Sequence, residues 1–248
     1  MIITTSWDDG HVLDLKLADM LDKHGLKGTF YIAHNYLDER MSDQQIRDLS
    51  YRHEIGAHTL NHPTLTKVKD ETALNEIKGS KTWLEFILGK QVTSFCYPKG
   101  MYTSTHCRIV KEAGFTMART VTPYEFDIGK DPFQMPTTIH LYPFPLRPIK
   151  GLRGVRTRLQ PIRNYMHHHP RLNIPLTALT NWTSLATALL DVAQEKNGVW
   201  HLWGHSWEIE KFDMWSQLDS ILAIASTYQA QAKTNTETIL SRKWKPHV

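Results

Sequence analysis

The feature that most constrains the fold is an alternation of short β-forming runs with longer amphipathic segments. The run 29–33 is rich in β-branched and aromatic residues, whereas 68–88 places leucine and isoleucine at helical spacing. The expected strands are 2–7, 29–33, 54–57, 92–97, 116–120, 137–142 and 199–204. The expected helices are 12–23, one beginning at Ser42, 68–88, 103–113, 182–195 and 214–229. This order predicts an α/β fold with a parallel sheet and outer helices, and the length suits a distorted or incomplete (β/α) barrel.

Composition indicates one sizeable core. With 248 residues, 41% of them hydrophobic, a single domain spanning 1–248 is expected. The two cysteines, Cys96 and Cys107, argue against a disulfide framework and against a cysteine-based zinc site. No apolar run approaches the ~20 residues of a membrane span, and no secretory signal is visible, so a cytoplasmic location is expected. Fourteen histidines direct attention to metal or proton chemistry.

The positive charge is unevenly distributed. The formal net charge is +4, and no acidic residue lies between Asp131 and Asp191. Within that stretch, 143–181 is rich in proline, arginine and histidine and has no clear period, so we interpret it as a basic insertion. Two interpretations stay open, a solvated loop and a lid that attracts an anionic group of the substrate.

Two adjacent carboxylates, Asp8 and Asp9, follow the first expected strand in the sequence SWDDG. Asp-Gly is a common turn pair, so a surface turn is the simpler interpretation. However, barrels carry active residues at the carboxyl ends of their strands, and His58, 97–100 and His205 also follow expected strands. Because neighbouring side chains on a strand point to opposite faces, one aspartate could bind a metal while the other transfers a proton.

His58 and His62 are four residues apart in the sequence HTLNH. They could share a metal if the backbone turns helically there, although this spacing alone is a weak signal. One aspartate and two histidines provide three ligands and leave coordination positions open, which is typical of catalytic metal sites. Zinc is the expected ion, and nickel, cobalt or iron would also suit these ligands.

These sequences resemble the motifs of the polysaccharide deacetylases of the NodB-homology class, metal-dependent carbohydrate esterases that act on N-acetyl sugars. The corresponding segments here are 6–10 (SWDDG), 58–62 (HTLNH), 96–100 (CYPKG) and 202–205 (LWGH). The resemblance covers about residues 1–120 and, less closely, 198–208. It implies that Asp8 is the general base, that Asp9, His58 and His62 hold the metal, that the backbone N–H of Lys99 faces the oxyanion, and that His205 is the general acid.

The chain departs from the family pattern at its third motif. Cys96 stands where the family has an arginine that orients the catalytic aspartate. A cysteine cannot form that ion pair, and we expect Arg119, at the end of the 116–120 strand, to supply the charge. His201 competes with His205 for the acid role; we prefer His205, because Gly204 lets the strand end bend toward the site.

The expected function is removal of an N-acyl group from an amino sugar that carries a phosphate, nucleotide or acidic group. Acetyl is the leading candidate for the acyl group. Tyr97, Trp203 and Trp207 are the candidate substrate contacts, since aromatic rings can stack on sugars. Two alternatives remain. One is a deformylase or other C–N amidohydrolase with a different small substrate, and the other is a non-catalytic glycan-binding relative. No nucleic-acid polymer is expected as a partner.

Overall fold

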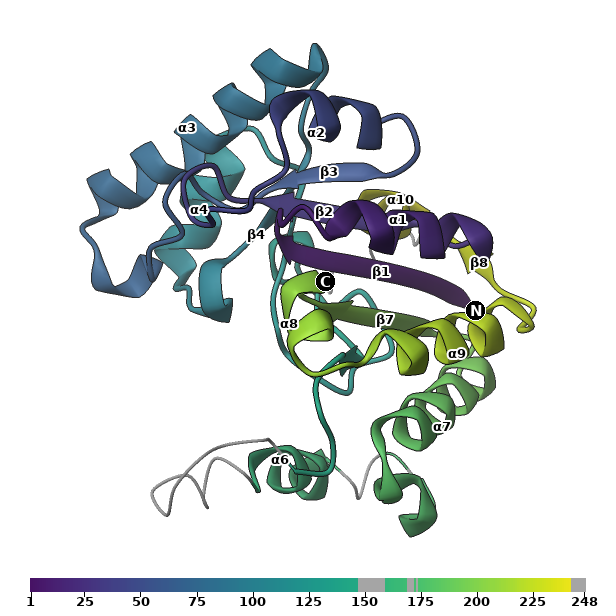
Figure 1. The fold of residues 1–248 in the computed structure, drawn as a ribbon. Helices are drawn as coiled ribbons and strands as arrows, with labels where there is room; N and C mark the ends of the chain where they lie inside the picture. The colour runs from purple at the N-terminus through teal and green to yellow at the C-terminus, as the bar shows by residue number, and fades with distance from the viewer. Residues whose placement is uncertain (147–158, 169–171, 173, 242–248) are drawn as a thin grey trace.

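The computed structural model describes residues 1–146, 159–168, 172 and 174–241. Its strands form one parallel sheet in the order β5-β4-β3-β2-β1-β7-β6, with β8 pairing with β1. The strands are β1 (Ile2–Asp9), β2 (Gly28–Ile32), β3 (Glu54–Ala57), β4 (Ser94–Cys96), β5 (Met117–Arg119), β6 (Ile139–His140), β7 (Val199–Gly204) and β8 (Gln231–Ala232). The sheet curls into part of a barrel, which confirms the predicted fold class (Figure 1).

The helices connect the strands on the outside of the sheet (Figure 1). They are α1 (Asp14–Lys23), α2 (Asp43–Leu49), α3 (Asp70–Leu88), α4 (Ser104–Glu112), α6 (Gln160–His168), α7 (Trp182–Glu195), α8 (Ser206–Lys211), α9 (Trp215–Ser226) and α10 (Asn235–Ser241). The helix expected at Ser42 begins with a capping box, in which Ser42 and Gln45 satisfy each other's backbone N–H groups. Within the described residues, no helix combines the length and apolar character needed to cross a membrane.

The segment 143–181 is more ordered than expected over the part that the structure describes. It contains α6 and a 3₁₀ helix, Leu176–Thr180, where the sequence shows no clear period. Tyr165 of α6 is fully buried and packs edge-on against Tyr124. Most of its basic residues fall within 147–158 and 169–171, outside the described residues, so the anion-binding interpretation stays a prediction.

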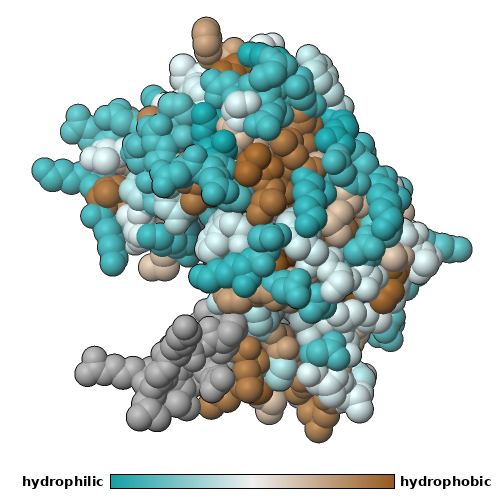
Figure 2. All heavy atoms as spheres, in the orientation of Figure 1, coloured by the Kyte–Doolittle hydropathy of each residue, from teal (hydrophilic) through white to brown (hydrophobic). Residues whose placement is uncertain are grey.

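The beginning of β1 has a different neighbour from its end. Because β2 begins opposite Thr5, β8 pairs with Ile2 and Ile3 instead. Directly after β8, Asn235 is fully buried, accepts a hydrogen bond from Thr4 and donates to the Tyr31 hydroxyl, both at 2.9 Å. This polar network joins the start of α10 to β1 and β2. The surface in Figure 2 is hollowed at the carboxyl ends of the strands.

Candidate active site

Asp8 and Asp9 lie at the carboxyl end of β1, and both are almost fully buried. Asp9 has a φ of 82°, in the left-handed region, so the regular alternation of side chains ends at this residue. Asp9 Oδ1 lies 3.7 Å from His58 Nε2, and ligand atoms of Asp8, His58 and Cys96 lie within 4.8 Å of one another. The side chains of Asp8 and Asp9 were expected on opposite faces of the strand. The structure corrects this, because the change in backbone conformation brings both carboxylates to His58.

Asp9, His58 and His62 form a buried group of three possible metal ligands. The Nε2 atoms of the two histidines are 3.1 Å apart, and that of His62 is 3.6 Å from Asp9 Oδ1, which has no hydrogen-bond partner among the described residues. His58 Nδ1 lies 2.8 Å from the carbonyl oxygen of Cys96, so donation there leaves the Nε2 lone pair free. Burial lowers the pKa of both histidines, for His62 to about 3, which keeps them neutral near pH 7. The three residues fit a divalent transition metal.

The loop that carries the two histidines is not helical, although their spacing of four residues suggested that a helical turn would be needed for them to share a metal. Thr59 and His62 have positive φ values of 68° and 51°, and the Thr59 hydroxyl accepts a hydrogen bond from the His62 N–H. Glu76 of α3 accepts hydrogen bonds from the backbone N–H groups of Leu60 and Asn61, at 2.9 and 2.8 Å. This carboxylate, which sequence reasoning missed, fixes the loop so that both imidazoles face Asp9.

Arg119 forms a buried ion pair with Asp8. It is the cross-strand register partner of Cys96, so the guanidinium comes from β5 instead of β4. The Cys96 thiol lies 3.8 Å from the other Asp8 oxygen. Burial alone would raise the pKa of Asp8, but the charge of Arg119, followed by those of His58 and His205, lowers it to about 2. Asp8 is therefore ionised and oriented without an arginine at position 96.

His205 and His201 occupy different environments. His205 follows β7, and its Nε2 lies 3.9 Å from Asp9 Oδ2, while its Nδ1 lies 2.6 Å from Glu208 of α8. Although burial opposes the charged form, Glu208 and then Asp9 raise the pKa of His205 to about 9. His201 is buried within the sheet between the Ser6 hydroxyl and the Pro136 carbonyl, and burial lowers its pKa to about 3. Of these two histidines, His205 is the one that lies within 4 Å of Asp9.

The predicted substrate contacts lie in three different places. Tyr97 is fully buried and its hydroxyl donates to the Phe133 carbonyl, so its side chain presents no exposed surface in this structure. The Trp207 indole donates to Asp9 Oδ2 at 2.9 Å and thus orients a candidate ligand. Trp203 lies over Arg119, with 4.8 Å between the ring centre and Cζ, and lines a neighbouring cavity. Lys99 has a φ of 58° in the turn after β4, and its side chain lines the same cavity.

Tyr36 and Glu208 are further site residues that the motifs do not contain. The ring of Tyr36, in the segment after β2, stacks on the His62 imidazole with 4.0 Å between centroids. No local signal in the sequence marks it. Glu208 could have been found, because it lies three residues after His205, the spacing at which helical side chains meet.

Residues 2–118 match the family model for polysaccharide deacetylases. The chain is 26% identical over 119 residues to the peptidoglycan-N-acetylglucosamine deacetylase of Bacillus cereus, covering 47% of this chain and 43% of the relative. It is 27% identical over 107 residues to the peptidoglycan-N-acetylmuramic acid deacetylase PdaA of Bacillus subtilis, covering 40% and 38%. The matches thus span less than half the length of these relatives.

Solved structures share the fold over most of the chain. A Mycobacterium smegmatis protein assigned as a polysaccharide deacetylase superposes with a TM-score of 0.66 at 16% identity, covering 99% of this chain and 93% of that one. A CE4-family pseudoenzyme from Bacillus anthracis superposes with a TM-score of 0.57 at 12% identity, covering 96% and 65%. The family match includes the strand ends that carry Asp8, Asp9, His58 and His62. Over residues 2–118 the chain therefore resembles the polysaccharide deacetylases, at low identity to the relatives that it matches.

Proposed function

We propose that the protein is a metal-dependent hydrolase that removes an N-acyl group from an amino sugar, with acetyl as the leading candidate for that group. The observation that carries the proposal is the proximity of three functional groups. A paired carboxylate, Asp8, and a candidate ligand group around Asp9 lie together, and His205 Nε2 is 3.9 Å from Asp9. The names of the two peptidoglycan deacetylases support an N-acetylated amino sugar as the substrate.

A divalent metal held by Asp9, His58 and His62 would polarise the amide carbonyl and acidify the attacking water. Asp8 has a different task, since Arg119 holds it ionised and oriented. In the proposed reaction the oxygen of the water attacks the carbonyl carbon, and Asp8 accepts the proton that the water loses. The same ion pair makes Asp8 a weak base, so the acidity of the water is essential to this step.

His205 supplies the proton for the leaving amine. Because its Nδ1 is hydrogen-bonded to Glu208, the Nε2–H is the donor on the side of Asp9. A pKa of about 9 keeps the imidazole protonated near neutral pH. The backbone N–H of Lys99 is the proposed donor to the oxyanion of the tetrahedral intermediate. Transfer of the His205 proton to nitrogen then allows the C–N bond to break.

The direct test is acyl release by the purified protein, stripped of metal and reconstituted with zinc, nickel, cobalt or iron. We expect acetate from N-acetylglucosamine oligomers only with metal, and at least a hundredfold loss of kcat in Asp8→Asn. Asp219→Asn, in a surface ion pair with Lys23, is the matched control. Stoichiometric metal with formate release alone would indicate a deformylase. If the protein neither binds metal nor releases an acyl group, the enzyme is rejected in favour of a glycan-binding relative.

A further inference from the structure

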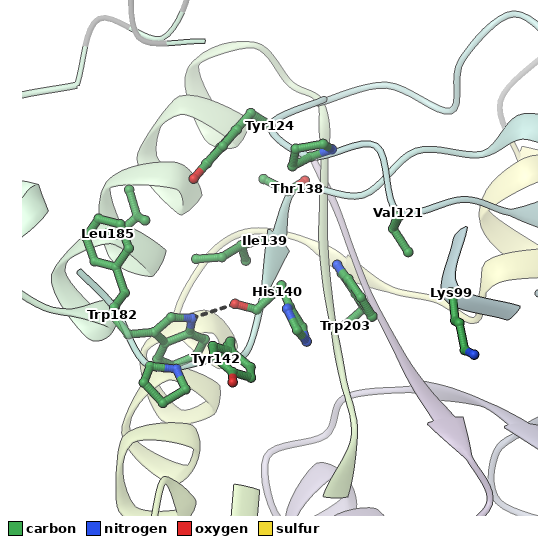
Figure 3. Close-up of a pocket in the computed structure, with 13 residues that line it drawn as sticks. Lys99, Val121, Tyr124, Thr138, Ile139, His140, Tyr142, Trp182, Leu185 and Trp203 are labelled. Atoms are coloured by element: carbon green, nitrogen blue, oxygen red, sulfur yellow. Dashed lines mark hydrogen bonds between the residues drawn. The ribbon is translucent and has the colours of Figure 1, made fainter. Parts of the chain in front are cut away.

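A cavity of about 390 Å³ adjoins the proposed catalytic residues. Its walls come from the ends of β6 and β7, the segment after β5, and α7 (Figure 3). Trp203 lines it and lies 4.8 Å from the guanidinium carbon of Arg119, the partner of Asp8. His140 also lines it, and its Nε2 lies 3.6 Å from Glu208, the partner of His205. A substrate whose amide lies beside Asp8 would therefore have a neighbouring group within reach of this cavity.

Away from Lys99 the lining is mainly aromatic and aliphatic, with polar atoms contributed by Thr138, His140 and two tyrosines. In Figure 3, Tyr142, Trp182 and Leu185 gather on one side of His140, and Lys99 lies on the other. Two polar groups of the wall are already engaged, because the Trp182 indole donates to the His140 carbonyl at 2.9 Å and the Thr138 hydroxyl donates to the Glu125 carbonyl at 2.8 Å. Hydroxyl groups of a sugar ring would lose hydration at these positions without gaining hydrogen bonds.

The volume also exceeds what a single acetyl methyl would fill, and it lies in the range of ~300–1,000 Å³ that is typical of small-molecule pockets. We propose that this cavity binds an alkyl or aryl group that the substrate carries next to its scissile amide. The inference rests on the proposed function. Two sources share this chemistry, namely a longer N-acyl chain and an apolar aglycone.

The first experiment separates these sources with two substrate series. One varies the acyl group of methyl glucosaminide from acetyl through butyryl to hexanoyl, and the other varies N-acetylglucosaminides from methyl to octyl. We expect kcat/KM to rise about fourfold per methylene in one series until the cavity is filled. A rise in the first series assigns the cavity to the acyl chain, and a rise in the second assigns it to the aglycone. Flat profiles in both would overturn the inference.

Phe144, half-buried in the cavity wall, provides the variant. Phe144→Glu should remove most of the chain-length preference, whereas Phe86→Glu, at a side chain that is 86% exposed on α3, should leave it intact. Leu185→Phe is the second variant and should shorten the longest chain that is accepted. An unchanged preference in both Phe144→Glu and Leu185→Phe, with each variant folded by circular dichroism, would contradict the assignment.

Calorimetry with octyl and methyl glucoside separates failure of the inference from failure of the proposed function. We expect the octyl compound to bind more tightly to the wild type, and the difference to fall at least tenfold in Phe144→Glu. If no amide is hydrolysed but this difference is found, the proposed reaction fails and the apolar site stands. If amides are hydrolysed but neither this difference nor a chain-length preference in either series is found, the site fails and the reaction stands.

Discussion

Glu208 controls the proposed acid through a single hydrogen bond. It lies 2.6 Å from His205 Nδ1, and its own pKa, which burial alone would raise, is lowered to about 2 by the nearby imidazoles of His140, 3.6 Å away, and His205. It is thus ionised throughout the range in which His205 titrates. In this role Glu208 is a positioning residue, because it acts through the imidazole.

We therefore expect Glu208→Gln to move the alkaline limb of the kcat profile to lower pH by at least one unit. His205 must be protonated to donate, so activity falls as pH rises through its pKa, and removal of the negative charge lowers that pKa. The measurement is kcat from pH 6 to 10, with Glu210→Gln in the same helix as control. A drop in kcat without a shift of the alkaline limb would contradict the proposed role of Glu208.

Cys96 and Arg119 face each other across β4 and β5, so their side chains can be exchanged as a pair. Arg119→Cys should reduce kcat at least a hundredfold, because it leaves Asp8 buried and unpaired. The double variant Cys96→Arg, Arg119→Cys should recover at least tenfold of this loss. Arg108→Cys, an exposed arginine of α4, serves as control. No recovery in a folded double variant would show that position 119 is required for another reason.

At the scale of elements, α3 stabilises the loop that presents the histidines. Glu76→Gln keeps the shape of the side chain but weakens its hydrogen bonds to the N–H groups of Leu60 and Asn61. Partners that orient ligands typically contribute 10–100-fold to metal affinity, so we expect at least a tenfold increase in the metal Kd by competition with a chelator. Glu112→Gln of α4 should have no effect. An equal Kd in Glu76→Gln would mean that the loop is rigid without α3.

His201 connects β7 to β1 through the Ser6 hydroxyl, and it makes stability depend on pH. Its folded-state pKa of about 3 is below the unfolded value, so its contribution is complete above about pH 6.5 and is lost as pH falls toward 3. Between pH 6.5 and 4.5 the wild type should lose about 2 kcal/mol more than His201→Gln. Guanidinium unfolding at both pH values tests this, and equal losses would contradict it.

The predictability of each element follows from its length and local pattern. The bounds expected for β3, α7 and β7 are those observed, because dense apolar periodicity and turn residues mark their ends. β8 has two residues and α8 has six, too few to show a period. Asp8, Asp9, His58 and His62 belong to contiguous motifs, whereas Glu76 and Tyr36 reach the site only through tertiary packing.

At the scale of the whole molecule, the proposed metal would join segments that are distant in the sequence. It would link the end of β1 to the loop after β3, and Trp207 of α8 already contacts Asp9. A ligand at 100 times its Kd stabilises the folded state by about 2.7 kcal/mol, which corresponds to about 5–10 °C for a chain of this size. Calorimetric melting with zinc and with a chelator should show this difference in the wild type and lose it in His62→Gln. Equal melting temperatures in the wild type would argue against the site.

The register of Cys96 with Arg119 has a consequence for recognising inactive relatives of the polysaccharide deacetylases. A search that reads only along the chain finds cysteine at the third motif and misses the arginine that pairs with Asp8 from the next strand. Register partners on adjacent strands lie side by side, so a side chain from either strand can reach the same neighbour, and one substitution can compensate for another 23 positions away. To decide whether a relative is a pseudoenzyme, one must therefore inspect the residues that contact the aspartate in space, whichever strand they come from.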